Sequence, residues 1–99
     1  METLTKPEMT VAQVGNKFKV FKVRGGRGAE MPNHISTKEA VVVVLQGEAV
    51  LKIQGKEIRL KTSDSAIIPA QVPHTLQIEE DFVSDVIMEI DSEIKFTNQ

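Results

Sequence analysis

Short runs of apolar residues alternate with turn residues along almost the whole chain, and no long apolar stripe recurs at the helical period. This pattern predicts an all-β protein. The predicted strands cover Thr10–Val14, Phe18–Arg24, Ala40–Gln46, Ala49–Gln54, Glu57–Lys61, Ala66–Ile68, Thr75–Glu79, Val83–Ile90 and Glu93–Phe96.

Two local features indicate a curled sheet. Within residues 51–60 the alternation places every apolar side chain on one face, around a turn at Gln54 and Gly55, which predicts a hairpin with one dry face. Within residues 18–23 the alternation changes phase between Val20 and Phe21, which predicts a bulge or bend in that strand. Bends of this kind form the corners of a barrel wall.

The stretch Ala40–Leu45 is apolar on both alternating sets, whereas a strand with one face on solvent would carry polar residues at every second position. Something is therefore expected to cover its outer face. The chain's own N-terminal strands could do so, or a partner subunit could. For so small a barrel the pattern favours a homodimer.

The chain has 99 residues, 40% of them hydrophobic and 26% charged, which suits one globular domain. We expect a polar leader over residues 1–8 and a single domain over residues 9–99. The net charge of −2 argues against nucleic acid and anionic membranes as partners. The single Arg-Gly-Gly element at residues 24–26 does not change this, because no aromatic residues are interleaved with it.

Several residue types are missing, and their absence narrows the chemistry. The sequence has no cysteine, tyrosine or tryptophan, so thiolate ligands, thiol nucleophiles and phenolic acids are excluded. No apolar run has the length of a membrane span, and residues 1–8 carry no signal-peptide core. We therefore expect no membrane association and a cytoplasmic location.

Two segments contain glycine, proline and histidine at spacings typical of a known family. The first runs from Gly28 through His34 to Gly47, and the second contains Pro69 and His74; fifteen residues separate Gly47 from Ser63. These segments resemble the paired motifs of the cupin superfamily. The resemblance covers residues 28–78 and implies a small antiparallel cupin β-barrel, also described as a double-stranded β-helix or jelly roll.

The resemblance also implies a metal site, but only part of one. Metal-bearing cupins use three histidines and one glutamate, and only His34 and His74 match those positions here. Ser36 and Ala40 stand at the other two. Glu39 lies one residue before the glutamate position, where the strand period turns it to the opposite face unless a bulge re-aims it. The resemblance therefore implies a divalent transition metal (Zn, Ni, Mn or Fe) at the two histidines, with Glu39 as the candidate third ligand.

Two functions are compatible with this motif set. In one, the metal at His34 and His74 binds or transforms a small organic molecule in the barrel. In the other, the same cavity is a metal-free binding module or sensor in which the histidines supply hydrogen bonds. In both, Ser36, Gln71 and Met88 are predicted to line the cavity. Whether the protein is an enzyme stays open, although sugar-nucleotide epimerase chemistry is disfavoured because that resemblance requires a tyrosine.

Overall fold

The computed structural model describes residues 6–97, and the all-β prediction is confirmed. Most of the predicted leader, residues 1–5, lies outside the described residues, and Glu8 already opens the first strand. Among the described residues no helix is long and apolar enough to cross a membrane. The strands are β1 (Glu8–Val14), β2 (Phe18–Gly25), β3 (Glu30–Ser36), β4 (Ala40–Ile53), β5 (Lys56–Lys61), β6 (Ser65–Ile68), β7 (His74–Glu89) and β8 (Ile94–Phe96).

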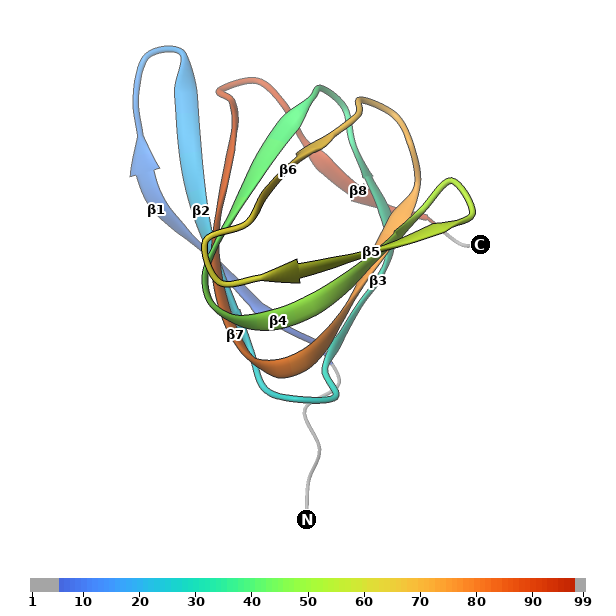
Figure 1. Cartoon of the computed structure of the whole chain (residues 1–99). Coiled ribbons are helices and arrows are strands. Elements are labelled where there is room, and N and C mark those ends of the chain that lie inside the picture. The colour runs from blue at the N-terminus through green and yellow to red at the C-terminus, as the bar shows by residue number, and fades with distance from the viewer. Residues whose placement is uncertain (1–5, 98–99) are drawn as a thin grey trace.

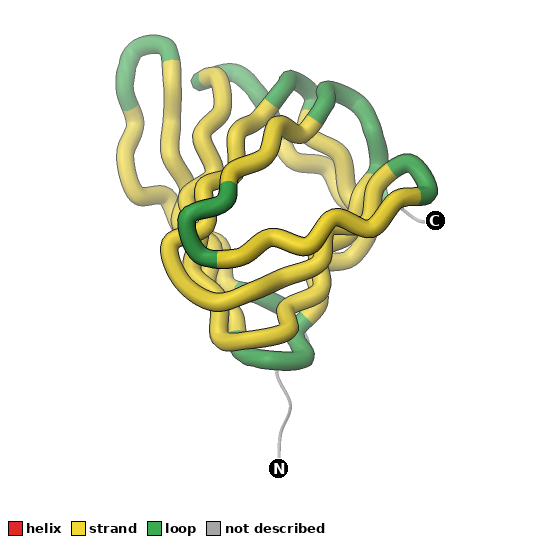
Figure 2. The backbone as a smooth tube through the Cα atoms, viewed as in Figure 1, coloured by secondary structure: helices red, strands yellow, loops and turns green. Residues whose placement is uncertain are grey.

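The strands form one antiparallel sheet that curls into a barrel (Figures 1 and 2). Along one path the order is β1-β2-β7-β3-β8, and β4 pairs with β5, β6 and β7. The two longest strands, β4 and β7, pair along almost their whole length, from Ala40 opposite Met88 to Ile53 opposite His74. The barrel fold expected from the cupin resemblance is therefore present.

Both long strands bend at one place, where the sequence predicted two separate strands in each. The register shifts between Val44 and Ala49, but the strands continue through the bend. Gly47 has a φ of 87°, and a Cβ there would lie 1.9 Å from the carbonyl oxygen of Asp81. Glycine at this position therefore lets the two strands approach closely and turn the corner together.

The N-terminal hairpin corrects two expectations. The bulge predicted in β2 between Val20 and Phe21 lies instead in β1, where Ala12 has no register partner, while β2 pairs regularly with β7. The hairpin also extends the sheet beside β7 rather than covering the outer face of β4. Its turn projects from the barrel in Figure 1, and Val11 and Val14 are 59% and 63% exposed.

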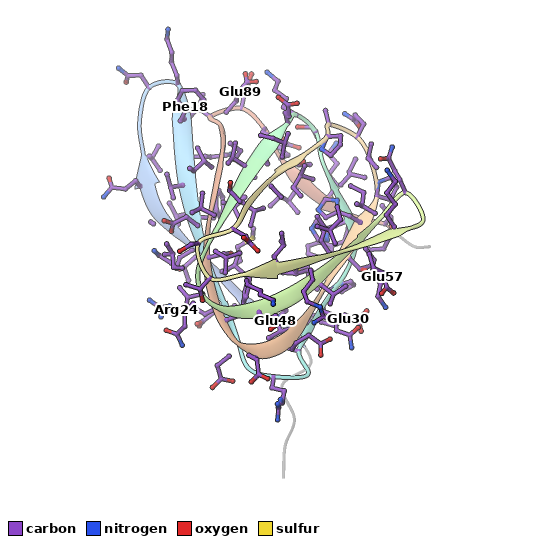
Figure 3. All side chains as sticks on the ribbon, in the orientation of Figure 1. Phe18, Arg24, Glu30, Glu48, Glu57 and Glu89 are labelled. Atoms are coloured by element: carbon purple, nitrogen blue, oxygen red, sulfur yellow. The ribbon has the colours of Figure 1, made fainter. Side chains whose placement is uncertain are left out.

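The core fills the barrel interior, and alternation along each strand decides which residues contribute to it. Ala40 and Val44 of β4 are buried with Phe82 of β7. The predicted hairpin is confirmed: Gln54 and Gly55 both have positive φ, as a two-residue type I′ turn requires. Charged side chains such as those of Arg24 and Glu57 point outward (Figure 3).

The outer face carries an apolar row that crosses four strands. Because Val42 and Val44 face inward, Val41 faces outward. In the register, Val41 lies between Ile87 of β7 and Ile67 of β6, and Val20 of β2 follows beyond Ile87. We call residues 20, 87, 41 and 67 the outer row. Ile67 is 56% exposed, so within the described residues nothing covers this end of the row.

Candidate functional site

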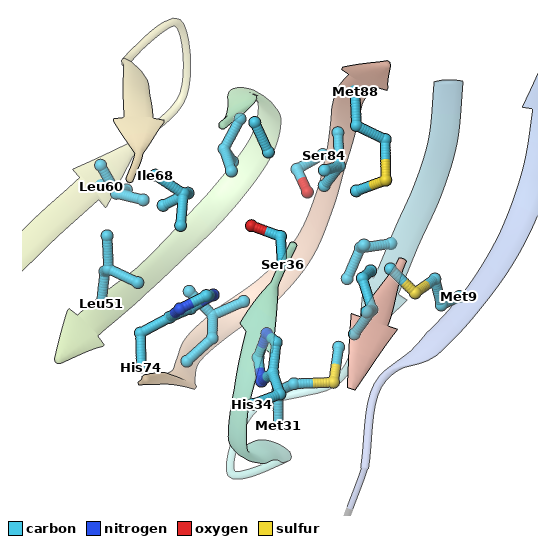
Figure 4. A pocket seen from close by; sticks show the side chains of 16 residues that line it. Met9, Met31, His34, Ser36, Leu51, Leu60, Ile68, His74, Ser84 and Met88 are labelled. Atoms are coloured by element: carbon cyan, nitrogen blue, oxygen red, sulfur yellow. The ribbon is translucent and has the colours of Figure 1, made fainter. Parts of the chain in front are cut away.

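Two histidines from distant parts of the sequence meet at one end of the barrel interior. His34 lies on β3, in a segment for which no strand was predicted, and His74 begins β7; the two are register partners. Their ring centroids are 4.2 Å apart at an interplanar angle of 60°, and each residue is only 7% exposed. Figure 4 shows both rings directed to the same space. The ring centroid of Phe96 on β8 lies 5.4 Å from that of His34.

Backbone carbonyls determine which ring nitrogen carries the proton. Nδ1 of His34 lies 2.6 Å from the carbonyl oxygen of Pro32, and Nδ1 of His74 lies 3.0 Å from that of Val72. A carbonyl oxygen can only accept, so each Nδ1 must donate. In the neutral rings both Nε2 atoms therefore keep a free lone pair, available to a ligand or a metal.

Burial keeps the two imidazoles in the neutral form. Desolvation lowers the pKa of His34, an effect that the hydrogen bond to Pro32 opposes and the nearby His74 reinforces. Desolvation likewise lowers the pKa of His74, against the opposing effect of its hydrogen bond to Val72. Near neutral pH the pair therefore consists of two hydrogen-bond acceptors rather than two cations.

The histidines form one end of a cavity of about 60 Å³, well above the roughly 10–15 Å³ that one water needs. Its wall is mainly aliphatic, and three methionines, Met9, Met31 and Met88, contribute to it. Besides the histidines, its polar side chains among the described residues are Ser36 and Ser84, and none of its lining residues is Lys, Arg, Asp or Glu. The space is thus apolar and uncharged, with four polar groups.

The structure brings together four of the six site residues named from the sequence. His34, His74, Ser36 and Met88 all line the cavity. Gln71 does not: it is exposed, and its side-chain amide donates to the carbonyl of Thr37 at 3.2 Å. Its backbone N–H donates to the carbonyl of Ser36 at 2.8 Å, so Gln71 fastens the loop before β7 to the end of β3.

Glu39 is also not brought to the histidine pair. It is exposed in the turn before β4, whereas Ala40, the next residue, is buried and faces the cavity. No bulge re-aims it, because the register of β4 is regular from Ala40 to Val44. Among residues 6–97 no group of three His, Cys, Asp or Glu side chains could hold a metal. The described residues therefore supply two imidazole ligands and no third ligand of these types.

Ser84 and Met9 are cavity residues that sequence reasoning missed. Ser84 belongs to no motif, and its only signal is parity: it shares the inward face of β7 with Phe82 and Met88. Met9 was the first residue of the predicted domain and lay just before the first predicted strand, although it opposes Val23 in the β1–β2 pairing. Neither position could be recognised without knowing which strand face is inward.

Comparison with known proteins agrees with this geometry. Residues 20–88 match the family model described as "Cupin domain". Over 67 residues the chain is 33% identical to quercetin 2,3-dioxygenase of Bacillus subtilis, covering 66% of this chain and 20% of that relative. The chain therefore spans only a small part of that larger protein.

Solved structures reproduce the whole barrel. A cupin superfamily protein from Desulfitobacterium hafniense has a TM-score of 0.79 at 19% identity, covering 92% of this chain and 84% of its own. A protein with a double-stranded β-helix domain from Klebsiella pneumoniae gives 0.83 at 20% identity, with coverage of 100% and 90%. Salicylate 1,2-dioxygenase from Pseudoaminobacter salicylatoxidans, in complex with gentisate, gives 0.83 at 17% identity over 99% of this chain and 32% of that one.

Proposed function

Because the chain belongs to the cupin domain family, we propose that its barrel binds a small organic molecule between the histidine pair and the apolar wall. The observation that carries the proposal is the cavity, in which four buried polar side chains interrupt an otherwise apolar and uncharged lining. Ligand sites are typically concave and apolar, with a few polar groups that fix orientation. The gentisate complex of salicylate 1,2-dioxygenase, a structural neighbour, is consistent with this role.

The histidines give such a ligand a defined partner. Each Nε2 is an acceptor that the fold holds in place through the Nδ1 hydrogen bond. A ligand hydroxyl or N–H can donate to it, and a neutral imidazole is also suited to accept a proton as a general base. The pair therefore supports binding and would support proton abstraction from the bound molecule.

The methionines provide a direct test of binding. Met9, Met31 and Met88 line the cavity, so their ¹³C-labelled methyl groups report on anything that enters it. We expect a panel of single-ring alcohols, ketones and phenols to include compounds that shift these resonances. An Ala40→Phe variant, which fills the cavity, should abolish the shifts. If no compound moves the methionine signals, or if the variant responds equally, the proposal fails.

A metal at the same site is the second candidate, favoured by the two free Nε2 atoms on adjacent rings. Nδ1 donation to a carbonyl is the usual support for a histidine that ligates metal. The other residues do not complete the set, since the described part of the chain offers no third His, Cys, Asp or Glu beside the pair. Such a site would be weak, and imidazole ligands suit Zn, Ni and Fe better than Mn.

Elemental analysis tests the metal candidate. Protein purified without an affinity tag is compared with a His34→Ala, His74→Ala double variant, and a cavity site predicts metal in the first and none in the second. Equal content in both would remove this candidate. It would leave the binding of an organic molecule untouched.

We also propose that the protein is a homodimer formed through the outer row. The row is apolar across four strands, and Phe18, on the same face, is 57% exposed. The ion pair between Lys22 and Asp85 lies beside the row, so a two-fold-related copy can exchange these charges across the interface while burying the row against itself. A second copy therefore fits both the apolar and the charged part of the face.

Sedimentation velocity at tens of micromolar tests this assembly. We expect a dimer for the parent chain and a monomer for Val41→Lys. The control is Ile58→Lys, which changes an exposed residue outside the outer row and should leave the dimer intact. A monomeric parent chain would contradict the proposal.

The cytoplasmic location expected from the sequence stays a prediction, to be tested by cell fractionation.

A further inference from the structure

We propose that Ser36 and Ser84 form a hydroxyl subsite that selects an uncharged ligand carrying a hydroxyl or carbonyl group. This inference rests on the proposed binding function and names the chemical class of the molecule bound. It does not require a metal.

Ser84 is buried in the middle of the inner wall. It is 1% exposed and pairs with Val23 on one side and Val44 on the other, so its neighbours across the sheet are apolar. Its Oγ has no hydrogen-bond partner among residues 6–97. Figure 4 shows Ser84 at the part of the cavity farther from the histidine rings, with its hydroxyl directed into the cavity.

Ser36 ends β3 and lies between the histidines and Ser84 in Figure 4. It is 3% exposed, and its backbone carbonyl already accepts the N–H of Gln71. Its side-chain Oγ, like that of Ser84, has no hydrogen-bond partner in the part of the chain that the structure describes. Two unpartnered hydroxyls thus line one small space.

The energetic cost of leaving the Ser36 and Ser84 hydroxyls without hydrogen bonds indicates that they bind a ligand. A buried hydroxyl without a hydrogen bond destabilises a protein because its lost hydration is not replaced, and an alanine at either position would avoid this penalty. The groups become favourable once a molecule in the cavity bonds to them. A serine hydroxyl both donates and accepts, so it suits either a hydroxyl or a carbonyl oxygen.

The rest of the lining excludes charged ligands. The cavity wall contains no Lys or Arg to pair with a carboxylate and no Asp or Glu to pair with an ammonium, among the residues that the structure describes. Moving an ion into such a space forfeits its hydration without compensation. Methionine side chains in the wall adapt to apolar ligands of different shape. The polarity of the ligand, rather than its shape, therefore decides whether it binds.

Three probes of similar size isolate these effects: phenol, toluene and benzoate at pH 7.5. Each is titrated against the full chain with methionine methyl NMR as the readout. We expect phenol to bind about 2- to 12-fold more tightly than toluene, the range of one net hydrogen bond, and benzoate to bind more weakly than either. In a Ser36→Ala, Ser84→Ala double variant the phenol-to-toluene affinity ratio should fall by about twofold or more from its parent value, with toluene binding retained; any remaining preference for phenol comes from donation to a histidine Nε2.

Ser92→Ala is the matched control, because Ser92 is buried but does not line the cavity; the ratio should stay at its parent value. Absence of binding by all three probes would overturn the proposed function together with this inference. Equal phenol and toluene affinities in the parent chain, or a ratio that survives the double variant, would overturn the serine subsite alone. Tightest binding by benzoate would overturn the selection for uncharged ligands.

Discussion

Two buried serines in this barrel have opposite surroundings. Ser92, which is 0% exposed, accepts the backbone N–H of Lys38 on its Oγ at 3.2 Å, and its carbonyl accepts the ammonium of Lys19 at 2.7 Å. Ser84, which is 1% exposed, has no hydrogen-bond partner for its hydroxyl among the residues that the structure describes. The same residue type is therefore part of a closed hydrogen-bond network in one region and left open in the other.

The comparison teaches that burial alone does not identify a side chain that binds a ligand. The side chain must also lack a hydrogen-bond partner within the fold. Around Ser92 the polar groups satisfy one another, as expected where they only stabilise a turn. In the cavity the fold satisfies one nitrogen of each histidine and leaves the other free, and it leaves the hydroxyls of Ser36 and Ser84 unpaired. The cavity is thus prepared for a partner from outside the chain.

Gly47→Ala should have the largest effect, because it breaks the scaffold that carries both regions. The new Cβ would collide with the carbonyl of Asp81, a backbone atom that cannot move aside. We expect a loss of roughly 3 kcal/mol or more in the free energy of unfolding, measured by urea denaturation.

Gly28→Ala is the control for that variant. Gly28 also has a positive φ, of 90°, but a Cβ there meets nothing within 4 Å. The loss should be only about 1–2 kcal/mol, the strain of the left-handed conformation. Equal losses in the two variants would mean that the close approach at Gly47 does not matter.

His74→Ala should have the next largest effect, because one ring nitrogen of this histidine already donates a hydrogen bond within the fold. The variant leaves the Val72 carbonyl without its donor and opens space beside His34. We expect destabilisation by about 2–3 kcal/mol. Thr75→Ala, at the neighbouring half-buried position, should cost less than 1 kcal/mol. A neutral His74→Ala variant would contradict the assigned hydrogen bond.

The serines themselves should respond in opposite directions. Ser92→Ala removes a hydroxyl that accepts a hydrogen bond and should destabilise by about 1–2 kcal/mol. Ser84→Ala removes an unsatisfied hydroxyl and should leave the ligand-free protein unchanged or up to about 1 kcal/mol more stable. Thermal unfolding of both variants measures the contrast. Equal destabilisation would indicate that Ser84 has a partner in the protein.

The smallest effect is a pH dependence from the histidine pair. Because the folded state lowers the pKa of both histidines, the unfolded state binds more protons and stability falls as the pH decreases. At pH 6.5, the ordinary histidine pKa, the loss relative to high pH is at most about 0.4 kcal/mol for each histidine, and it grows on further acidification. Urea titrations from pH 8 to 5 measure it. A His34→Ala, His74→Ala variant with the same slope would assign it to other groups.

Much of the fold could be predicted from the sequence because alternation and turn chemistry are local. The hairpin at Gln54 and Gly55 was predicted by a two-residue turn and by apolar residues on one face. The strand containing His34 was missed, since Pro32 and Asn33 indicate a loop. The prediction divided β4 because Gly47 marks a turn unless the close approach of the other strand is known. It divided β7 because the run Glu79–Asp81 was interpreted as a charged turn.

The candidate site was predictable only as far as the family motif reached. His34, His74 and Ser36 occupy motif positions, so their shared cavity followed from the resemblance. Ser84 has no motif, and the absence of a partner for its hydroxyl depends on three-dimensional packing. Gln71 was misplaced because a loop residue within the motif segment, between Pro69 and His74, can face either way, and here it faces solvent.

The most direct test of the central claim is a high-resolution crystal structure of the protein soaked with phenol. The account predicts a ring in the cavity with its oxygen within hydrogen-bond distance, at most about 3.2 Å, of Ser36 Oγ or Ser84 Oγ. A cavity without phenol, with both hydroxyls turned to backbone carbonyls, would contradict it.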